Sequence, residues 1–542
     1  MNVFIGGAWV YANGSLHLGH IASLLPGDIL ARYFRLKGQQ VLYVSGSDCN
    51  GTPIAVKARR EGVPASTIAN QYHQEFIHCY QKLGFTYDSY SRTDSTQHHH
   101  VVQEVFMQLM KKGYIFRKDV EQTFCQSCDQ FLPDRFVVGN CPVCDTFARG
   151  DQCDHCSTIL DPLELNHRKC SICGTEPAIR DTEHFYFKLS QLQNFLEGFT
   201  LNAETNSLWR ENALSLTSRY LQEGLKDRAV SRDLPIGVSV PIEGYENKKI
   251  YVWVEAVIGY LSASKIINQS ESFWEKDTIS YYVHGKDNIP FHTIFWPAIL
   301  KGIEHNGLPT HIISNEYLTL EKKKLSTSKN WAVWLPDFLE KYDPDSLRYF
   351  LTINAAEKRD ADFSWREFIY SHNSELLGAY GNFVNRTFQF VVKFFEGKLN
   401  GGEVNQEIVL EMEKLYLQTG ERIEKANLKF ALEEIFSYVR KSNKYFDEKQ
   451  PWKQVKENRE NCEQILKDCS FIIINLANLL SPFLPFSSEK ILKMAQIEST
   501  EWKPIQLNSL KLLNVAPIFQ RIDEAKIQTE VELLHKQGTE ST

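Results

Sequence analysis

Near the start of the chain, apolar positions first form a short continuous run and then recur at helical spacing. Residues 2–12 form a short apolar run that predicts a buried strand. Residues 16–38 place apolar side chains three and four positions apart, which predicts a helix that Gly38 is expected to end. Residues 39–53 predict a second strand that leads into a loop of Gly, Asn and Pro. This order indicates an α/β fold with a parallel, doubly wound sheet.

The pattern of the sheet is interrupted and later resumed. Residues 116–225 break into cysteine pairs, prolines and charged loops, which predicts a small inserted domain. Strand and helix patterns return in residues 228–238 and 249–263, and residues 279–300 repeat the strand–loop–helix unit. We therefore expect an N-terminal domain whose two halves are separated by the insert.

Beyond residue 366 the pattern becomes helical. Residues 421–446 have apolar positions at helical spacing with charges between them, which predicts part of a helix bundle. These apolar positions are Ile423, Ala426, Phe430, Ile435, Tyr438 and Val439. The longest apolar run, residues 471–486, contains two asparagines and two prolines, so a membrane span is not expected. The polar end, residues 532–542, is expected to fray.

Composition places the chain among ordinary globular proteins. It has 542 residues, of which 43% are hydrophobic and 23% are charged, and this length requires several domains. The formal net charge of −7 argues against a protein that coats nucleic acid nonspecifically, although a local basic surface is compatible with it. The first residues lack the basic and apolar regions of a signal peptide, so we expect a cytoplasmic location.

Eight of the twelve cysteines form four C-x-x-C pairs. The pairs are Cys125/Cys128, Cys141/Cys144, Cys153/Cys156 and Cys170/Cys173. Each such pair delivers two thiolates from one turn, and four thiolates complete a tetrahedral Zn²⁺ site, so two structural zinc sites are expected. Sequential and nested pairing of the four turns are both compatible with the spacing. Redox-active or free cysteines are the less favoured reading, because four pairs within so short a segment are hard to explain otherwise.

Two short motifs predict a polyphosphate site. The stretch "YANGSLHLGH" at 11–20 places two histidines and a glycine at the start of the predicted helix, where an anion is favoured. The stretch "KKKLSTSKN" at 322–330 combines lysines with small hydroxyl residues. Phosphate transfer requires positioned donors around charged oxygens, which both motifs can supply. Each motif taken alone is more often an ordinary polar helix start or a solvated loop.

Together the two motifs resemble the signatures of class I aminoacyl-tRNA synthetases, and further stretches resemble the methionyl members of that class. The matching stretches occur in order over nearly the whole chain. They are 11–20, 46–54 ("GSDCNGTPI"), 131–137, 180–190, 231–237, 251–260 ("YVWVEAVIGY"), 285–298 ("GKDNIPFHTIFWPA"), 343–351, 381–386 ("GNFVNR") and 447–452 ("DEKQPW").

The resemblance implies a domain order. The expected segments are a Rossmann catalytic domain in two halves at 1–115 and 226–320, a zinc-knuckle insertion at 116–225, a lysine-loop and stem-contact segment at 321–365, an anticodon-binding helix bundle at 366–510 and a C-terminal extension at 511–542. Nothing after residue 515 resembles the β-barrel that makes some members dimers, so a monomer is expected.

The resemblance also implies the activity of a methionine–tRNA ligase. Members couple L-methionine to ATP, release pyrophosphate, and transfer the methionyl group to the 2′-hydroxyl of the terminal adenosine of tRNA(Met), including the initiator. Mg²⁺ is expected to accompany ATP. The methionine carboxylate attacks the α-phosphorus directly, so the protein supplies proximity and charge stabilisation.

The resemblance assigns roles to individual residues. His17, His20 and Lys324 correspond to the catalytic group of the two motifs. ATP binding is implied for Gly19, Asn13, Arg232, Asp287, Ser326, Thr327 and Ser328. Methionine binding is implied for Ala8, Trp9, Tyr11, Asp48, Trp253, Ala256, Tyr260 and His292. Asp48 corresponds to the carboxylate that pairs with the substrate ammonium group, and Asp287 to the one that holds the ribose. Reading of the anticodon is implied for Asn382, Arg386 and Trp452.

For the cysteines, the resemblance implies nested pairing. One-zinc members keep the inner group of Cys141, Cys144, Cys153 and Cys156, and two-zinc members add the outer group of Cys125, Cys128, Cys170 and Cys173. The sequence also departs from the common bacterial pattern at Trp9, Val10, Val257, Asn288 and Thr327. Thr327 replaces a second lysine, and Asn288 is a feature of archaeal and eukaryotic members. We therefore expect archaeal- or eukaryote-like pocket features in an active enzyme.

Two alternatives compete with this hypothesis. A class I enzyme for leucine or valine would share both signatures, but such enzymes usually carry a large editing insert. A zinc-containing tRNA-binding protein without activity would not require His17, His20, Asp48, Asp287 and Lys324. A separate run of three histidines, His98–His100, is predicted to form a solvated helix start in preference to a metal site, because adjacent residues do not share a helix face.

Overall fold

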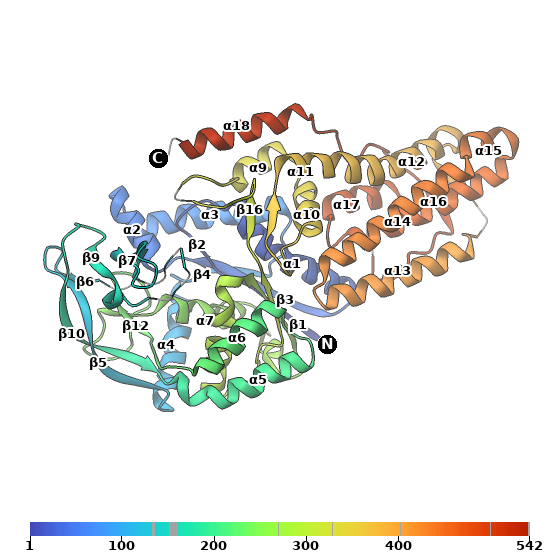
Figure 1. The fold of residues 1–542 in the computed structure, drawn as a ribbon. Coiled ribbons are helices and arrows are strands. Elements are labelled where there is room, and N and C mark those ends of the chain that lie inside the picture. The colour runs from blue at the N-terminus through green and yellow to red at the C-terminus, as the bar shows by residue number, and fades with distance from the viewer. Residues whose placement is uncertain are drawn as a thin grey trace.

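The fold joins a parallel-sheet domain, a cysteine-bearing insert and a helix bundle (Figure 1). It was obtained as a computed structural model. The structure describes residues 1–132, 136–150, 153, 155–156, 158, 160–268, 270–327, 329–400, 403–498 and 500–539.

A six-stranded parallel sheet forms the centre of the N-terminal domain. Its strands follow the order β15-β14-β1-β3-β2, and β4 pairs with the other edge of β3. Their bounds are β1 Asn2–Gly7, β2 Val10–Tyr11, β3 Gln40–Asp48, β4 Ser89–Arg92, β14 Ile279–Gly285 and β15 His311–Asn315. The chain proceeds from β1 to β3 on one side and returns to β14 on the other. The carboxyl ends of β1, β3 and β14 therefore border the crevice where α/β sheets bind ligands.

Both faces of the sheet are covered by helices. Along β1, Val3 and Ile5 belong to the buried cluster that contains α1 (Leu18–Leu36), whereas Phe4 belongs to the cluster that contains α4 (Thr96–Lys111) and α7 (Val252–Ser264). This alternation follows from the two-residue period of a strand. It confirms the predicted α/β class, in which one helix face and one strand face bury each other.

The insert projects from the sheet domain on a long two-stranded arm. Strand β5 (Ile115–Cys125) pairs antiparallel with β10 (Ala178–Phe187) over its length from Phe187 to Ala178. Between the two strands lies a small sheet of β7 (Val137–Asn140), β8 (Phe147–Arg149) and β9 (Asn166–Cys170). The arm lies at the left of Figure 1 and separates the cysteine pairs from the main core.

The C-terminal part of the chain is a helix bundle. Its helices are α11 Trp365–Ser371, α12 Asn382–Phe395, α13 Gln406–Glu424, α14 Leu428–Lys449, α15 Pro451–Glu457, α16 Arg459–Leu480 and α17 Pro485–Met494. Between the sheet and the bundle lie α9 (Leu335–Lys341) and α10 (Pro344–Ile353).

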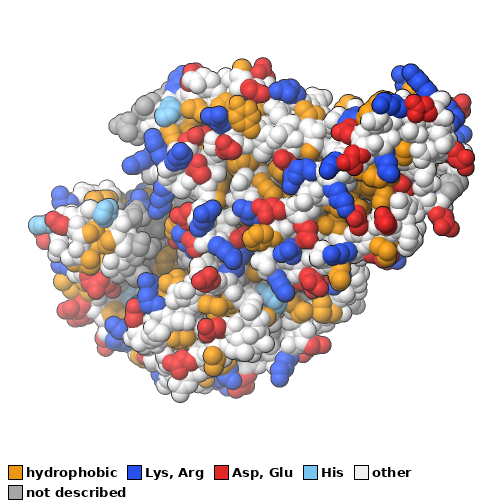
Figure 2. All heavy atoms as spheres, turned by 45° about the vertical axis from the view of Figure 1, so that its right-hand side comes forward, with side chains coloured by type: hydrophobic (Ala, Val, Ile, Leu, Met, Phe, Trp, Pro, Cys, Tyr) orange, Lys and Arg blue, Asp and Glu red, His pale blue; other side chains and the backbone are white. Residues whose placement is uncertain are grey.

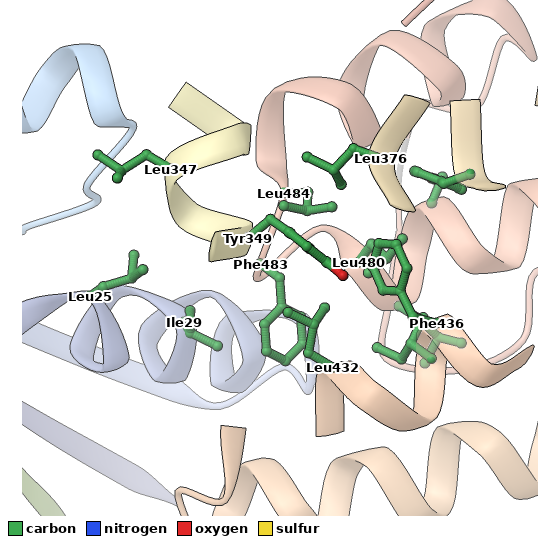
Figure 3. Packing of buried hydrophobic residues seen from close by; sticks show 14 of the residues in the cluster. Leu25, Ile29, Leu347, Tyr349, Leu376, Leu432, Phe436, Leu480, Phe483 and Leu484 are labelled. Carbon is green, nitrogen blue, oxygen red and sulfur yellow. The ribbon is translucent and has the colours of Figure 1, made fainter. Parts of the chain in front are cut away.

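The bundle and the sheet domain share one hydrophobic core. Figure 3 shows Leu25 and Ile29 of α1 facing the same interior as Leu347 of α10 and Leu432 of α14. Phe483, in the turn after α16, lies between them. Because their apolar surfaces are buried together, α1 and the bundle cannot separate without exposing this core.

The structure corrects the helical prediction for residues 421–446. The chain leaves α13 at Glu424 and enters α14 at Leu428, and Ala426 between them has a left-handed backbone with φ of 52°. The N–H of Asn427 donates to the carbonyl of Arg422, as in a Schellman helix end. The helical period continues across this break, so periodicity alone does not reveal it. Phe430, expected on the apolar face, is 46% exposed.

The prediction of a frayed end is wrong for the residues up to 539. Helix α18 (Ala525–Thr539) contacts α11, and its Leu534 is buried. The ring of Trp331 lies against Gly538, which places α18 beside the predicted lysine loop. Within the described ranges, none of the helices combines the length and apolar character that a bilayer crossing requires.

Candidate functional site

The two histidines of the first motif form the N-terminal cap of α1. The Nδ1 atom of His17 accepts a hydrogen bond from the backbone N–H of Gly19 (3.1 Å), and Nδ1 of His20 accepts one from the N–H of His17 (3.2 Å). The two rings stack with centroids 3.8 Å apart. This reciprocal arrangement is a capping box built from imidazoles in place of the usual hydroxyl and carboxylate.

The caps also determine where the imidazole protons lie. A neutral imidazole carries one proton, and each Nδ1 atom here is an acceptor, so the proton of each ring is on Nε2. Burial lowers the pKa of His17 to about 4, and burial together with His17 lowers the pKa of His20 well below its usual range. Both rings are therefore neutral near pH 7. They offer two Nε2–H donors beside the N-terminus of a helix, which suits an anion.

The lysine motif forms a hairpin with strands β16 (Leu318–Leu320) and β17 (Lys323–Lys324). Its two turn residues, Glu321 and Lys322, have φ of 48° and 62°, the left-handed pair that a type I′ turn requires. A second tight pairing follows, in which Ser326 and Trp331 exchange backbone hydrogen bonds of 3.0 and 2.9 Å. Lys324 and Thr327 are exposed on this hairpin, and Ser326 is half-buried.

The hairpin lies over the start of α1. The N–H of Leu18 donates to the carbonyl of Val333 (3.3 Å), and the N–H of Leu335 donates to the carbonyl of Leu16 (2.8 Å). A Cβ added to Gly19 would lie 3.0 Å from the Leu325 side chain and 3.0 Å from the His17 ring. A larger residue at position 19 would therefore push the hairpin away from the histidines.

A tyrosine joins the predicted ribose residue to the predicted catalytic lysine. The Tyr317 hydroxyl donates to a carboxylate oxygen of Asp287, which is exposed after β14. The Nζ atoms of Lys324 and Lys286 lie 5.5 and 3.9 Å from the Tyr317 ring centroid. Burial raises the pKa of Tyr317, and the Asp287 carboxylate raises it further, so the hydroxyl remains a donor. Tyr317 was not among the residues predicted from the sequence.

Two other predicted ATP residues, Asn13 and Arg232, each contact a neighbouring side chain. The Asn13 carbonyl, in the turn after β2, accepts a hydrogen bond from Nζ of Lys57 (2.9 Å). The guanidinium of Arg232, on β12 (Ser231–Asp233), lies 4.0 Å from the centroid of the Tyr251 ring. Ser328 falls outside the described residues.

The predicted methionine residues line a wall at the carboxyl ends of β1 and β3. Tyr11 of β2 pairs in register with Asp48, and its hydroxyl accepts a hydrogen bond from Nε1 of Trp253 (2.8 Å). The Trp9 ring packs so closely on Gly46 and Gly259 that a Cβ on either would overlap it. Ala8 is buried in the turn between β1 and β2, and Ala256 is half-buried on α7, one turn before Tyr260.

Tyr260 and His292 form a hydrogen-bonded pair on this wall. Nδ1 of His292 is 2.8 Å from the Asn288 carbonyl, and Nε2 is 2.8 Å from the Tyr260 hydroxyl. A carbonyl can only accept, so Nδ1 carries the proton and the Tyr260 hydroxyl donates to Nε2. Burial lowers the pKa of His292 to about 4, which keeps it neutral. The pair presents aromatic surface with few spare polar groups, which suits a thioether side chain.

Asp48 lies at the end of β3 and is only 3% exposed. Its Oδ1 atom accepts hydrogen bonds from the N–H of Asn50 (3.1 Å) and the hydroxyl of Thr93 (3.3 Å). The Asn50 side chain in turn donates to a second buried carboxylate, Glu255 on α7, over 2.9 Å. Neither Asn50 nor Glu255 was assigned a role from the sequence, although a glutamate inside the apolar run of α7 is a signal that could have identified it.

The three predicted anticodon residues lie at the far end of the bundle. Asn382 and Arg386 are one helical turn apart on α12, and Asn382 is exposed. The Arg386 guanidinium donates to Asp447 (2.7 Å) and lies 5.9 Å from the centroid of the Trp452 ring, which is 41% exposed. An exposed aromatic ring beside a fixed arginine is suited to stacking on an unpaired base. On the face in Figure 2, basic and acidic side chains are interspersed.

The eight paired cysteines form two groups with nested connectivity. In the outer group, sulfur atoms of Cys125 and Cys173 are 3.4 Å apart and those of Cys128 and Cys170 are 4.0 Å apart. In the inner group, the Cys141–Cys156 and Cys144–Cys153 sulfur pairs are 3.7 and 3.6 Å apart. All four sulfurs of each group lie within 4.8 Å of one another. These separations fit the roughly 3.8 Å between thiolates that surround one zinc tetrahedrally.

The histidine run is a helix start, as predicted, but it is not solvated throughout. Ser95 caps α4 by accepting a hydrogen bond from the N–H of His98. His100 is exposed, whereas His98 is only 1% exposed and points toward Glu255 on the neighbouring α7. Packing of α4 on α7 buries this position. Among the described residues, only the two cysteine groups could hold a metal ion.

Sequence comparisons identify two consecutive parts of the chain. Residues 3–388 match the family described as "tRNA synthetases class I (M)", and residues 397–531 match the "Anticodon binding domain of methionyl tRNA ligase". The chain is 59% identical over 540 residues to a "Methionine--tRNA ligase" of Bacillus cereus (strain AH187), with 99% of both chains covered. A "Methionine--tRNA ligase" of Bacillus mycoides (strain KBAB4) has the same identity and coverage.

A solved structure has the same fold. The methionyl-tRNA synthetase of Mycobacterium tuberculosis, described as bound by methionyl-adenylate, superposes with a TM-score of 0.80 and 22% sequence identity, over 96% of this chain and 100% of that one. The free form of the same protein superposes with a TM-score of 0.72. With the family matches over both halves and the full-length relatives, the chain belongs to the methionyl class I tRNA synthetases.

Proposed function

We propose that this site joins L-methionine to ATP and then transfers the methionyl group to the 2′-hydroxyl of the terminal adenosine of tRNA(Met). The observation that carries the proposal is the hairpin of the lysine motif, which closes over the histidine cap of α1. Two segments that are far apart in the sequence thereby surround one anion-binding helix end. This is the arrangement that activation of a carboxylate by ATP requires.

For ATP, the neutral histidines and the hairpin have complementary roles. The Nε2–H groups of His17 and His20 donate to phosphate oxygens, and Lys324 supplies the positive charge that the leaving pyrophosphate requires. Gly19 allows the base to approach the helix. Asp287 accepts the ribose hydroxyls, and Tyr317 holds its carboxylate in place. Asn13, Arg232, Ser326, Thr327 and Ser328 complete the predicted ATP site.

For methionine, the carboxylate of Asp48 pairs with the ammonium group and the aromatic wall surrounds the thioether. Tyr11, Trp253, Tyr260 and His292 are joined in hydrogen-bonded pairs, so the wall is rigid before the substrate enters. Trp9 closes the wall against Gly46 and Gly259. The methionine carboxylate then needs only to be held in line with the α-phosphorus, which is catalysis by proximity.

For tRNA, the exposed end of α12 and the Trp452 ring form the proposed anticodon interface. Asn382 offers an amide for a base edge, Trp452 offers a stacking surface, and Arg386 is oriented by Asp447. The rigid shared core between α1 and the bundle holds this interface at a constant distance from the ATP site.

The two cysteine groups are proposed to hold two structural zinc ions. Cys141, Cys144, Cys153 and Cys156 would hold one, and Cys125, Cys128, Cys170 and Cys173 the other, as closed sites that stabilise the insert. Mg²⁺ is proposed to enter with ATP. A cytoplasmic location and a monomeric state remain predictions from the sequence, and light scattering of the purified protein tests the second.

Methionine-dependent exchange of pyrophosphate into ATP tests the first step, and charging of a tRNA(Met) transcript tests the second. Exchange with methionine, but not with leucine or valine, is the expected result. Exchange that is strongest with another amino acid would overturn the methionine assignment. Salt-dependent tRNA binding without any exchange would support a tRNA-binding protein without activity.

A further inference from the structure

A buried histidine lies behind the second carboxylate at the methionine site. Glu255 is fully buried, and its Oε2 atom lies 3.7 Å from Nε2 of His98. Neither of these two atoms has a hydrogen-bond partner among the described residues. The His98 ring also lies 6.3 Å, between centroids, from the ring of Trp9. The Glu255–His98 pair is therefore next to the wall of the proposed pocket.

The hydrogen bonds on the other side of His98 define its tautomer. The Ser262 hydroxyl donates to the carbonyl of Gly259 (3.1 Å), which uses its only proton. Nδ1 of His98 lies 2.8 Å from the same hydroxyl oxygen, so Nδ1 must be the donor in that bond. In the neutral ring, Nε2 then carries a lone pair. This lone pair faces the Oε2 atom of Glu255.

Two buried acceptors that face each other without a partner are unfavourable, and a proton on either group removes the mismatch. Either Glu255 is a neutral carboxylic acid that donates toward Nε2, or His98 is an imidazolium that donates toward Oε2. The net charge of the pair is zero in both cases. Burial raises the pKa of Glu255 and lowers the pKa of His98 to about 3, which favours the proton on Glu255.

The Asp48 carboxylate accepts more hydrogen bonds than the Glu255 carboxylate does. Its Oδ1 atom accepts two hydrogen bonds, from the Asn50 N–H and the Thr93 hydroxyl, and such bonds favour a charged carboxylate. Burial and the charge of Glu255 both raise the pKa of Asp48. The contribution of Glu255 disappears when Glu255 is neutral. Asn50 contacts both carboxylates, because its backbone N–H donates to Asp48 and its side chain donates to Glu255. The hydrogen bonds at Asp48 favour the charged form there, and the contact with His98 favours the neutral form of Glu255.

Among the other ionisable groups around the pair, the Asp94 carboxylate raises the pKa of both Glu255 and His98. Arg92, the last residue of β4, forms an ion pair with Asp94, with 2.7 Å between Nη2 and Oδ2. Burial lowers the pKa of His99 on α4, and Lys249 is a smaller influence on it. Burial raises the pKa of the Cys49 thiol, which keeps it neutral.

We propose that Glu255 keeps a proton that it shares with His98, so that this neutral pair leaves Asp48 as the single carboxylate facing the methionine ammonium group. Glu255 and His98 are positioning residues, because they act through Asn50 and Asp48. The proposal rests on the proposed function, in which Asp48 binds the substrate ammonium. A like-charged Glu255 behind Asp48 would instead drive a proton onto one of the two carboxylates.

Two substitutions of Glu255 and one of Asp48 separate the roles. Glu255→Gln keeps an oxygen for Asn50 and an N–H for His98, so it imitates the protonated acid. We expect its KM for methionine in pyrophosphate exchange to stay within about threefold of wild type. Glu255→Leu removes both contacts, and we expect a KM increase of about tenfold or more with a smaller change in kcat.

Asp48→Asn removes the charge and is expected to raise KM about a hundredfold or more. The control His100→Gln, on the exposed face of α4, should change neither constant.

The outcomes distinguish the proposal from its alternatives. If Glu255→Gln raises the KM as much as Asp48→Asn, Glu255 acts as an anion and the proposal is wrong. If Glu255→Leu lowers kcat and the melting temperature but leaves KM unchanged, the residue is only structural, and the proposal is also wrong. If Asp48→Asn has no effect, or if wild type shows no methionine-dependent exchange, the proposed function itself fails, whatever the Glu255 variants do.

Proton counting gives a readout that stability does not affect. Calorimetry of methionine binding to the wild-type protein near neutral pH, in buffers of different ionisation enthalpy, measures the protons released. We expect a value near zero for wild type and for Glu255→Gln, because Asp48 is already ionised. Release of about one proton on binding would place the shared proton on Asp48 and overturn the proposal.

Discussion

The Asp28 carboxylate and the Arg348 guanidinium form an ion pair of 2.7 Å in which both side chains are fully buried. Asp28 lies on α1 and Arg348 on α10, so the pair joins the sheet domain to the helices that lead into the bundle. Arg348 also donates to the carbonyls of Leu83, Pro482 and Phe483. One side chain thus connects the parallel-sheet domain, the end of α3 (Ala65–Leu83) and the turn after α16.

Loss of this pair should destabilise the whole chain. Asp28→Ala leaves a buried guanidinium without its counter-charge, and we expect a loss of about 3–5 kcal/mol in the free energy of unfolding. Urea unfolding at pH 7 measures it. Lys493→Ala, which breaks the exposed Lys493–Glu489 pair, is the control and should change stability by less than about 1 kcal/mol. Equal effects of the two substitutions would contradict the prediction.

The pair also predicts an acid limit to stability. Burial alone raises the pKa of Asp28, but Arg348 and Arg32 outweigh it and the pKa is lowered. The unfolded chain therefore binds a proton at Asp28 at a higher pH than the folded protein does. The contribution of the pair is complete above about pH 4 and is lost as the pH falls through the folded pKa. The difference between wild type and Asp28→Asn should shrink over that range.

Tyr317 should control ATP binding through Asp287. Tyr317→Phe removes the hydroxyl that donates to Asp287 but keeps the ring beside Lys324, so the KM for ATP should rise by about 2–10-fold. Tyr317→Ala also removes the ring and should lower kcat. Pyrophosphate exchange measures both constants. Tyr370→Phe, an exposed tyrosine on α11, is the control. A normal KM in Tyr317→Ala would show that Asp287 does not depend on this contact.

The histidine cap should act in its neutral form. Because burial lowers the pKa of His17 to about 4, its protonation does not change between pH 6 and 8. The kcat of the wild-type enzyme should show no fall with a midpoint near pH 6.5. The His17→Asn variant should therefore have the same flat pH profile in this range. Asparagine still caps α1 but lacks the ring N–H, so the melting temperature should be preserved while kcat falls by about 10–100-fold.

The same lowered pKa values make folding sensitive to mild acid. The unfolded chain takes up a proton at His17 near pH 6.5, whereas the folded protein does so only near pH 4. Stability should therefore decrease as the pH falls from about 6.5 to about 4. Thermal unfolding over this range measures the slope, which should be smaller in His17→Asn. An unchanged slope would mean that the pKa of His17 is not lowered in the folded protein.

Each cysteine group should bind one metal ion independently. Cys125→Ser in the outer group and Cys144→Ser in the inner group should each reduce the zinc content from about two ions per chain to about one. Atomic absorption of the purified variants measures the content. Cys79→Ser, a buried cysteine of α3 outside both groups, is the control. Loss of both ions in either single variant would contradict independent, nested sites.

The anticodon interface should affect charging but not activation. Trp452→Ala removes the exposed ring, and we expect kcat/KM for tRNA(Met) to fall by about 5–150-fold, equal to 1–3 kcal/mol. Trp452→Phe keeps a stacking surface and should retain most of the activity. Pyrophosphate exchange should be unchanged in both variants. A parallel loss of exchange would show that Trp452 acts through the fold of the bundle and not through the anticodon.

The sequence by itself determined the class of fold and the family. The apolar run of residues 2–12, the helix period of 16–38 and the repeated strand–loop–helix pattern at 279–300 are local properties, and they predicted the parallel sheet. The paired cysteines similarly predicted a metal-bearing insert, because a C-x-x-C turn presents two thiolates whatever surrounds it. The histidine and lysine motifs identified the family through their order along the chain.

Only the tertiary structure decided which distant groups meet. The spacing of the cysteines allowed two pairings, and the long β5–β10 arm brings Cys125 to Cys173. The helical period runs on through Ala426, but the crossing of α13 and α14 imposes a left-handed residue there. The sequence predicts a solvated His98, whereas the packing of α4 on α7 buries this side chain and directs it toward Glu255. Burial, tautomer and charge depend on partners far away in the sequence, and local patterns contain no record of those partners.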